Sequence, residues 1–510
     1  MALAAGLAAT LERWWFARAW GEAGTLTSVF YYGDATRLVD YASAILQGRP
    51  FDNGIPFHPP GWPVLLAVFL RLTGDGAAGA SALPVAAVKL FLAALGGASV
   101  ALASALAFEI AGFGAMLAVA LVGPFHFGHI VEGTVANSEA LYGLLLVVTL
   151  QGAWRWLRPD GGSRPLWAAV AGAAAGGAMV VRAEFLAAAV LLVPIAWWAD
   201  ARDGDSPGAR GRLRASALFA VAFIIVLAPT TVWHWRSLSA FNAAHVGRVA
   251  GPLPRFAPVT SYGPFNFAMA NHENADGGPN RDHPLLDRCG AEGEAGLAAG
   301  ELDLACPAVY DLYVNGYAIG RRWLVTHPAA ALALLTSKLS LMSGFLAHGY
   351  LVDNVGAGVT GTRRRVDLLD PRGRALVWIH LALVLGGVVV LRRRPVALAV
   401  IASAVVALLA STLMFYGYVR LGVAYLPALW VLQGAALSAL VQRGVTPKVA
   451  RPRRAAGVTV AVLALLLVLE AAHLGDARRL AVEGVRTPGG AIVQDESVEI
   501  GFPGLSPVRK

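Results

Sequence analysis

The stretch YYGDATRLVDYASAILQGRPFDNGIPFHPPGWP occupies residues 31–63 and is much more polar than the chain around it. After Asp34, the segment ATRLVDYASAILQG places apolar side chains along one stripe, which predicts a short amphipathic helix in the membrane interface that ends at Gly48. The prolines of HPPGWP, residues 58–63, predict a rigid turn before a second apolar segment at 64–72. We therefore expect two interfacial helices joined by a rigid turn.

Composition indicates a polytopic membrane protein. Hydrophobic residues make up 57% and charged residues 14% of the 510 residues, whereas soluble globular proteins carry about 25% charged residues. Apolar runs of about 17 to 25 residues are long enough to cross the hydrocarbon core as helices. We predict crossing helices near residues 84–108, 112–131, 133–157, 166–182, 184–199, 215–234, 375–391, 396–415, 421–441 and 456–474.

An eleventh apolar segment, residues 2–19, carries two charges in its middle, Glu12 and Arg13. These charges predict that the apolar part ends near Leu11, unless the true start of the protein lies upstream. The segment has no basic N-terminal region and no convincing cleavage site, so we interpret it as a retained first helix and not a signal peptide. The expected fold is all-α, with about eleven membrane-spanning helices.

The net charge of +9 arises in short loops, so it does not indicate a nucleic-acid partner. By the positive-inside rule, four basic loops are expected in the cytoplasm; they contain Arg155, Arg158 and Arg164, then Arg202, Arg210, Arg212 and Arg214, then residues 392–394, and finally Arg443, Lys448, Arg451, Arg453 and Arg454. The outer face then carries residues 21–83, 236–374, 416–420 and the C-terminal tail.

Residues 329–351 are apolar enough to cross the membrane, but counting them as a crossing helix would put two of the basic loops on the outer face. We therefore expect an interfacial helix there, with Lys338 in its midst.

This topology divides the chain into four parts. Residues 1–235 form an N-terminal transmembrane module that includes the first outer loop at 21–83. Residues 236–374 form a small outer subdomain, residues 375–474 the last crossing helices, and residues 475–510 an outer tail. The two cysteines, Cys289 and Cys306, both fall in the outer subdomain. In an oxidising compartment they predict a disulfide that contributes roughly 3 kcal/mol, with two unrelated thiols as the alternative.

Acids, histidines, asparagines and prolines concentrate in the two long outer loops. A carboxylate at the start of a helix meets free backbone N–H groups and the positive end of the helix dipole, so Asp34 is expected to be ionised and oriented. From the local pattern alone, a simple N-cap is the better interpretation of Asp34. Asp40, six residues on, is expected on another face of the helix.

Several further stretches carry a family resemblance. They are NSEALYGLLLVVTL at 137–150, MVVRAEF at 179–185, GPFNFAMANHENADGG at 263–278, THPAAALALLTSKL at 326–339 and YGYVRLGVAYLPALWVL at 416–432. Together with the acid, the short helix and the HPPGWP turn of the first loop, they resemble in order the GT-C superfamily of integral-membrane glycosyltransferases. The nearest branch is the bacterial one related to protein mannosyltransferases (glycosyltransferase family 39) and aminoarabinose transferases.

The resemblance implies a GT-C fold and an inverting transfer of a sugar from a polyprenyl-phosphate donor to a hydroxyl of a lipid, glycan or protein. It implies a bacterial inner-membrane enzyme whose active site faces the periplasm, with Asp34 as the catalytic carboxylate of the first loop. Many relatives carry Asp-Glu at that place, whereas this chain has Asp34 followed by Ala35. No residue at that position therefore corresponds to the second acid of those relatives. No cofactor is expected, because most of the branch works without a metal, although a divalent cation is possible.

An inverting transfer needs a base for the acceptor hydroxyl and cations for the leaving phosphate. Asp34 is the candidate base. The candidate phosphate ligands are Lys338, Arg420 and Arg182. The planar guanidinium group of arginine can donate two parallel hydrogen bonds to phosphate oxygens, and lysine acts as a point charge. For Lys338 and Arg420, snorkelling to lipid headgroups is the alternative.

HFGHIVEG at 126–133 invites a metal hypothesis because His126, His129 and Glu132 recur every three residues, but zinc sites usually need a further ligand. We instead expect Glu132 or Glu139 to help bind donor or acceptor, or simply to be acids favoured at a helix start. Further substrate-binding candidates are Asn271 and His272 in the polar outer loop, His58 in the rigid turn, and Asp40.

Two other classes of protein have a similar composition. A polyprenyl-lipid or polysaccharide flippase would carry intramembrane charges that face a cavity, and the predicted spans are nearly free of charge. A non-catalytic relative would keep the fold and lose the acid. Sugar transfer by a variant with Asp34→Asn separates these hypotheses.

Overall fold

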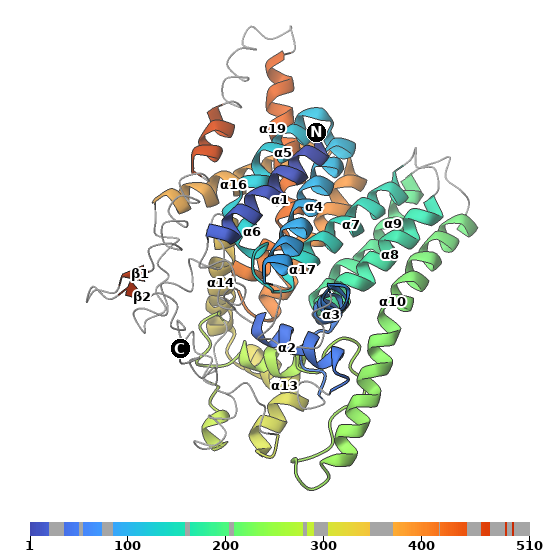
Figure 1. Ribbon diagram of the computed structural model, residues 1–510, viewed down its shortest axis with the longest axis vertical. Coiled ribbons are helices and arrows are strands. Elements are labelled where there is room, and N and C mark those ends of the chain that lie inside the picture. The colour runs from blue at the N-terminus through green and yellow to red at the C-terminus, as the bar shows by residue number, and fades with distance from the viewer. Residues whose placement is uncertain are drawn as a thin grey trace.

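The computed structural model describes residues 1–19, 35–49, 55–73, 85–158, 164–202, 209–278, 283–289, 304–346, 371–417, 419–445, 461–469, 485–486 and 492–493. Helices dominate this part of the chain (Figure 1). The long ones are α1 (Ala2–Ala19), α4 (Val85–Ala111), α7 (Glu139–Leu157), α8 (Arg164–Val181), α9 (Leu186–Arg202), α10 (Ala209–Ala244), α16 (Pro371–Leu391), α17 (Pro395–Met414) and α19 (Leu426–Val445). The predicted crossing segments therefore coincide with helices, and residues 461–469 of the last one are also helical.

Shorter helices complete the bundle. α5 (Phe113–Val122), η3 (Gly123–Phe125) and α6 (Phe127–Glu132) replace the single helix that the sequence predicts over 112–131. Likewise, α18 (Val419–Val423) is separate from α19, although the sequence predicts one helix over 421–441. Arg182 and η4 (Ala183–Phe185) interrupt the path from α8 to α9. The last two of these breaks lie next to residues of the site described below, Arg420 and Arg182 respectively.

Six described helices are long and apolar enough to cross a membrane, namely Ala86–Ala111, Glu139–Leu157, Arg164–Val181, Leu213–Ala244, Pro328–Leu346 and Pro395–Met414. Five shorter apolar helices accompany them, at Gly61–Leu72, Phe113–Phe125, Ala183–Ala199, Ala375–Leu391 and Leu426–Val441. The chain is therefore a multi-pass membrane protein, as its composition predicts. Pro328–Leu346 has the length of a crossing helix as well, so its interfacial position stays a prediction.

The basic loops meet at one end of the bundle. Glu109, near the end of α4, accepts hydrogen bonds from Arg155 (2.6 Å and 3.0 Å to Oε1) and pairs with Arg158 at 3.5 Å. Arg394, between α16 and α17, donates to the carbonyl oxygen of Ile110. Two of the four basic loops therefore contact the end of α4, at what we call the basic end.

The first helix, α1, continues past Glu12 and Arg13 to Ala19, so the prediction that this segment ends near Leu11 is wrong. Arg13 is fully buried; its Nη1 donates to the carbonyl oxygen of Ala9 at 2.9 Å and its Nη2 donates to His129 Nδ1 on α6. Since a guanidinium group only donates, that imidazole nitrogen must accept and cannot carry a proton. The pair joins α1 to α6, which explains how a charged residue is accommodated in an apolar helix.

The other end of the bundle carries the polar loops. α2 (Ala35–Leu46) and α3 (Gly61–Leu72) pack on each other, as predicted for the first loop. The second loop contains α11 (Gly263–Met269), η5 (Leu286–Cys289), α13 (Pro307–Thr326), α14 (Pro328–Ser343) and η6 (Gly344–Leu346). In Figure 1, α10 projects beyond its neighbours α8 and α9 towards α2 and α13. We call this the loop end.

The rigid turn fastens the first loop to the second. Thr260 Oγ1 donates to the carbonyl oxygen of Phe57, and the backbone N–H of Ser261 donates to the carbonyl oxygen of Pro56 at 2.9 Å. The ring of Phe57 stacks on Tyr262 with centroids 4.4 Å apart. The HPPGWP turn thus lies at the junction between the loops, in addition to reversing the chain.

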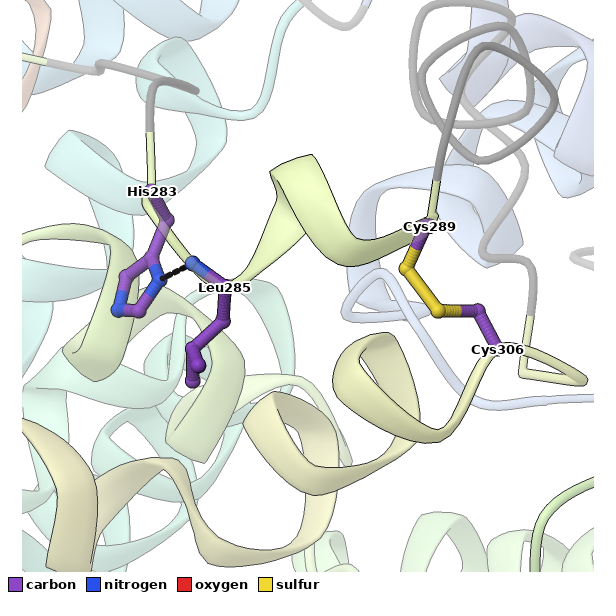
Figure 2. The surroundings of a disulfide bond; sticks show 4 residues. All are labelled: His283, Leu285, Cys289 and Cys306. Carbon is purple, nitrogen blue, oxygen red and sulfur yellow. Dashed lines mark hydrogen bonds between the residues drawn. A yellow bond between two sulfur atoms is a disulfide. The ribbon is translucent and has the colours of Figure 1, made fainter.

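A small core of its own stabilises the second loop. It contains residues of α10, α11, η5 and α13 and is separate from the main core of the bundle. The structure has a disulfide between Cys289 and Cys306, the predicted pair, which ties η5 to the start of α13 (Figure 2). The C-terminal tail contributes one feature that the all-helical prediction lacks, an antiparallel pair of two-residue strands, β1 (Val485–Arg486) and β2 (Ile492–Val493).

Candidate active site

Asp34, the predicted catalytic base, lies outside the described residues. α2 begins at the next residue, Ala35, which is fully buried. The apolar stripe of α2 also buries Leu38, Val39 and Ala42, whereas Asp40 is exposed. Asp40 therefore lies on another face of the helix, as expected.

A carboxylate shared by two arginines forms the centre of the loop end. Glu139 lies in the first turn of α7, and its Oε1 accepts a hydrogen bond of 2.6 Å from Arg182 Nη1. Arg420 Nε, on α18, lies 2.9 Å from the same oxygen. Arg182 also pairs with Glu184, because its Nε donates to Oε1 of that residue. Three of the sequence candidates are thus brought into direct contact from elements that are far apart in the chain.

The side chains of this ion cluster differ in how much of their surface is exposed. The side chain of Glu139 is 1% exposed, while those of Arg182 and Arg420 are 10% and 9% exposed. Glu139 Oε2 is buried and has no hydrogen-bond partner among the described residues. Removing one partner from such a buried ion cluster is costly because it leaves a charge uncompensated. Glu139 is therefore less accessible than the two arginines that contact it.

Two tyrosines pack against this cluster. Tyr142 OH and Tyr425 OH are 2.6 Å apart, and the guanidinium carbon of Arg182 lies 5.8 Å from the centre of the Tyr142 ring. Both tyrosines are buried. They join α7 to the start of α19 directly beneath the ion pairs, which restricts the positions that the arginines can take.

Lys338 is the second cationic feature of the loop end. It is fully buried on α14; its Nζ donates to Asn271 Oδ1 at 2.9 Å and to the carbonyl oxygen of Leu413 at 3.2 Å. The amide nitrogen of Asn271 donates to the carbonyl oxygens of Phe267 and Met414, which turns Oδ1 towards the lysine. Among the described residues, no carboxylate pairs with this ammonium group. In the described part of the chain, Lys338 thus has two neutral acceptors as its partners.

One short segment connects the lysine with the arginine pair. Leu413 accepts from Lys338, Gly417 follows four residues later, and Arg420 follows three residues after that. A Cβ at Gly417 would lie 1.8 Å from the carbonyl oxygen of Lys338, so only glycine allows this approach. The N–H of Gly417 donates to the carbonyl oxygen of Gly277, whose φ of +97° also favours glycine. The helices that carry the two cations, α14 and α18, accordingly pack on each other.

His272 lies next to Asn271 and packs against His283, with ring centroids 4.6 Å apart. Each ring accepts a backbone N–H at Nδ1: His272 from Asn274, and His283 from Leu285. Figure 2 shows the bond between His283 and Leu285. Burial, and then the neighbouring His272, lower the pKa of His283 to about 4. His272 therefore fastens the disulfide-bound segment to the loop that positions Lys338, which is a structural role that the sequence did not indicate.

The remaining candidates take structural positions. His58 Nδ1 lies 3.2 Å from Tyr41 OH, so the rigid turn is joined to α2. Glu132 ends α6, and its side chain is outside the described part of the chain. His126 Nε2 donates to the carbonyl oxygen of Leu346, and His129 bonds to α1. Within the described residues, no group of three or more metal-ligating side chains occurs.

Sequence patterns missed the partners of the candidate cations. Glu184, Tyr142 and Tyr425 lie within three of the five stretches that carry the family resemblance, but nothing in their spacing indicates that they meet. The carbonyl oxygen of Leu413 has no sequence signal at all. The buried Arg13 and Lys89, which donates to the carbonyl oxygen of Ala17 at 2.7 Å, also show that the helices contain more charge than the predicted spans suggested.

No family model and no curated protein matches the sequence. Among solved structures, the chain is similar to the oligosaccharyltransferase of Archaeoglobus fulgidus tethered to an acceptor peptide, with 12% identity and a TM-score of 0.54 over 96% of this chain and 56% of that one. The same enzyme in complex with an inhibitory peptide and a dolichol-phosphate gives 13% identity and a TM-score of 0.50 over 97% of this chain and 56% of that one. The chain spans a little over half the length of these transferases. It has the GT-C fold, as the sequence resemblance implies.

Proposed function

We propose that this chain is an inverting glycosyltransferase that moves a sugar from a polyprenyl-phosphate-linked donor to a hydroxyl of a lipid, glycan or protein. The basic end is proposed to face the cytoplasm, according to the positive-inside rule. The loop end then faces the periplasm of a bacterial inner membrane. A lipid phosphate reaches this end from the outer leaflet, and a polar acceptor reaches it from the aqueous side.

The observation that carries the proposal is Lys338, which is buried on α14 with two neutral acceptors, while α14 packs on α18, the helix that carries Arg420. A buried ammonium group with only neutral partners is unfavourable. A bound phosphate supplies a negative charge for it. On α18, the guanidinium group of Arg420 suits phosphate oxygens. A dolichol-phosphate is present in one of the structurally similar transferases, which fits a lipid phosphate as ligand.

In the proposed reaction, the acceptor oxygen attacks the anomeric carbon from the face opposite the phosphate. The carbon–oxygen bond to the phosphate breaks, and its electron pair remains on the phosphate oxygen. Asp34 takes the proton of the acceptor hydroxyl. Lys338, Arg182 and Arg420 stabilise the charge that develops on the leaving phosphate. Because the leaving group is already a phosphate, no protein acid is required, and no metal is part of the proposal.

The alternative of a lipid flippase has to account for the buried Arg13 and Lys89. Both residues bond to backbone or histidine partners that connect neighbouring helices, as α1 is connected to α4 and α6. This arrangement fits helix packing better than a path for charged cargo. We therefore retain the transferase as the proposed function.

Asp34→Asn tests the transferase directly. The chain in nanodiscs is incubated with a panel of radiolabelled polyprenyl-phosphate sugars, and release of polyprenyl phosphate is followed. We expect a loss of about 100-fold or more for Asp34→Asn, with Asp311→Asn, at a partly exposed carboxylate of α13, as a control that retains activity. Unchanged transfer by folded Asp34→Asn would show that another residue is the base. Failure of the unmodified chain with every donor would contradict the transferase itself.

A further inference from the structure

Glu139 has the wrong position for a residue that binds the sugar. Its side chain is almost fully buried, and its Oε1 is occupied by both Arg182 and Arg420. The two guanidinium groups that contact it are more exposed, so a ligand at the surface can reach them more readily than it can reach Glu139. Glu139 therefore acts on a ligand through the arginines, as a positioning residue and as a negative charge.

Carboxylates offset part of the positive charge of this cluster. Glu139 contacts both Arg182 and Arg420, and Glu184 contacts Arg182. Replacing Glu139 by a neutral side chain would therefore add one positive charge next to two of the proposed phosphate ligands.

The proposed reaction changes the charge of the lipid. A sugar-linked polyprenyl phosphate is a phosphodiester with one negative charge. After transfer, the lipid is a phosphate monoester, whose second pKa is about 6, so it carries nearly two negative charges at neutral pH. A strongly positive site therefore holds the product more tightly than the donor, and the product would block the next turnover.

We propose that Glu139 sets the net charge of the phosphate site so that it holds a monoanionic phosphodiester and releases the dianionic product. This inference rests on the proposed function. It also implies discrimination against diphosphate-linked donors, which carry at least one further negative charge. Electrostatic attraction at such short range changes affinity steeply, by about 10- to 100-fold for one added ligand charge at an effective dielectric constant near 20.

The test compares two lipids that need no knowledge of the sugar. Polyprenyl phosphate is a dianion at pH 8, and its methyl ester is a monoanion of the same lipid. We would measure the Kd of both for the full chain in nanodiscs. Glu139→Gln is expected to raise the preference for the dianion over the methyl ester by at least about tenfold at pH 8. At pH 5 both lipids are mainly monoanions, so the preference should then be similar in the variant and the unmodified chain.

The chain offers a matched control at the basic end. Glu109 is also a partly buried carboxylate that pairs with two arginines, Arg155 and Arg158. Glu109→Gln should leave the preference unchanged. Glu139→Asp keeps the charge and should restore the preference of the unmodified chain. If Glu139→Gln fails to fold, Glu184→Gln removes a negative charge from the same cluster and should shift the preference in the same direction.

Two outcomes would overturn the inference. One is an unchanged preference in folded Glu139→Gln or, where that variant does not fold, in Glu184→Gln. The other is an equal shift in Glu109→Gln, which would indicate a general loss of structure. In contrast, failure of the unmodified chain to bind either lipid would overturn the proposed function itself.

Discussion

Lys338→Met separates a functional charge from a structural one. The substitution keeps the length and apolar volume of the side chain and removes only the ammonium group. In the structure this group has two neutral acceptors, Asn271 Oδ1 and the carbonyl oxygen of Leu413. A charge that is kept for ligand binding should be lost with little damage to the fold, whereas a charge that holds the fold together should not.

The magnitudes follow from these contacts. Two hydrogen bonds from a charged donor contribute about 1.5–3 kcal/mol each, but burying an uncompensated charge costs several kcal/mol. These terms nearly cancel, so the free energy of unfolding should change by about 1 kcal/mol or less. A phosphate about 4 Å from an ammonium group gains about 4 kcal/mol at an effective dielectric constant of 20. We expect the Kd for polyprenyl phosphate to rise by about 100- to 1000-fold.

The assay is binding of labelled polyprenyl phosphate to the chain in nanodiscs, with thermal unfolding measured on the same samples. Lys89→Met is the matched control, because Lys89 is also a buried lysine whose ammonium group donates to a carbonyl oxygen, that of Ala17. This control should bind the lipid as the unmodified chain does. An unchanged Kd in folded Lys338→Met would refute the phosphate site, and a large loss of thermal stability would indicate that the lysine is structural.

Three further outcomes follow from the loop end. Gly417→Ala should disrupt both lipid binding and thermal stability, because its Cβ would lie 1.8 Å from the carbonyl oxygen of Lys338; normal binding would mean that the turn adapts. Replacing Cys289 and Cys306 by serine should destabilise the second loop by about 3 kcal/mol, measured as faster hydrogen exchange in η5. The lowered pKa of His283 means that its contribution to stability is present above its unfolded pKa of 6.5 and is lost as the pH falls towards about 4. Exchange protection near η5, corrected for the intrinsic pH dependence of amide exchange, should fall by up to about tenfold per pH unit in that window and become independent of pH in His283→Phe.

Hydrophobic runs predicted the helices well because crossing a membrane imposes a length and a composition on each helix. The breaks within them were harder to predict. The sequence gives a single span over 112–131, whereas the chain breaks at Gly123–Phe125 and restarts as α6. Arg13 shows the opposite error: its charge predicts an end of the helix, but a partner 116 residues away satisfies it. The sequence around a residue does not indicate a hydrogen-bond partner that lies so far along the chain.

The candidate site was predicted as residue types, without its connections. Arg182, Arg420 and Glu139 were identified separately, and only the fold shows that one carboxylate oxygen pairs with both arginines. Asn271 was expected to bind sugar hydroxyls, but its Oδ1 accepts from Lys338. The polar character of a loop indicates that hydrogen bonds will form; which partners form them depends on tertiary packing.

The contact between the two outer loops can form only after the second loop has been synthesised, long after the first. The bond between Thr260 and Phe57 joins residues 203 positions apart. At a translation rate of about 5–20 residues per second, the first loop waits about 10–40 s for its partner. During that interval, HPPGWP is outside the finished structure while most of the N-terminal helices are already made. Nascent chains that stop before residue 260 should therefore expose the first loop to proteases or chaperones at the membrane surface, and longer chains should protect it.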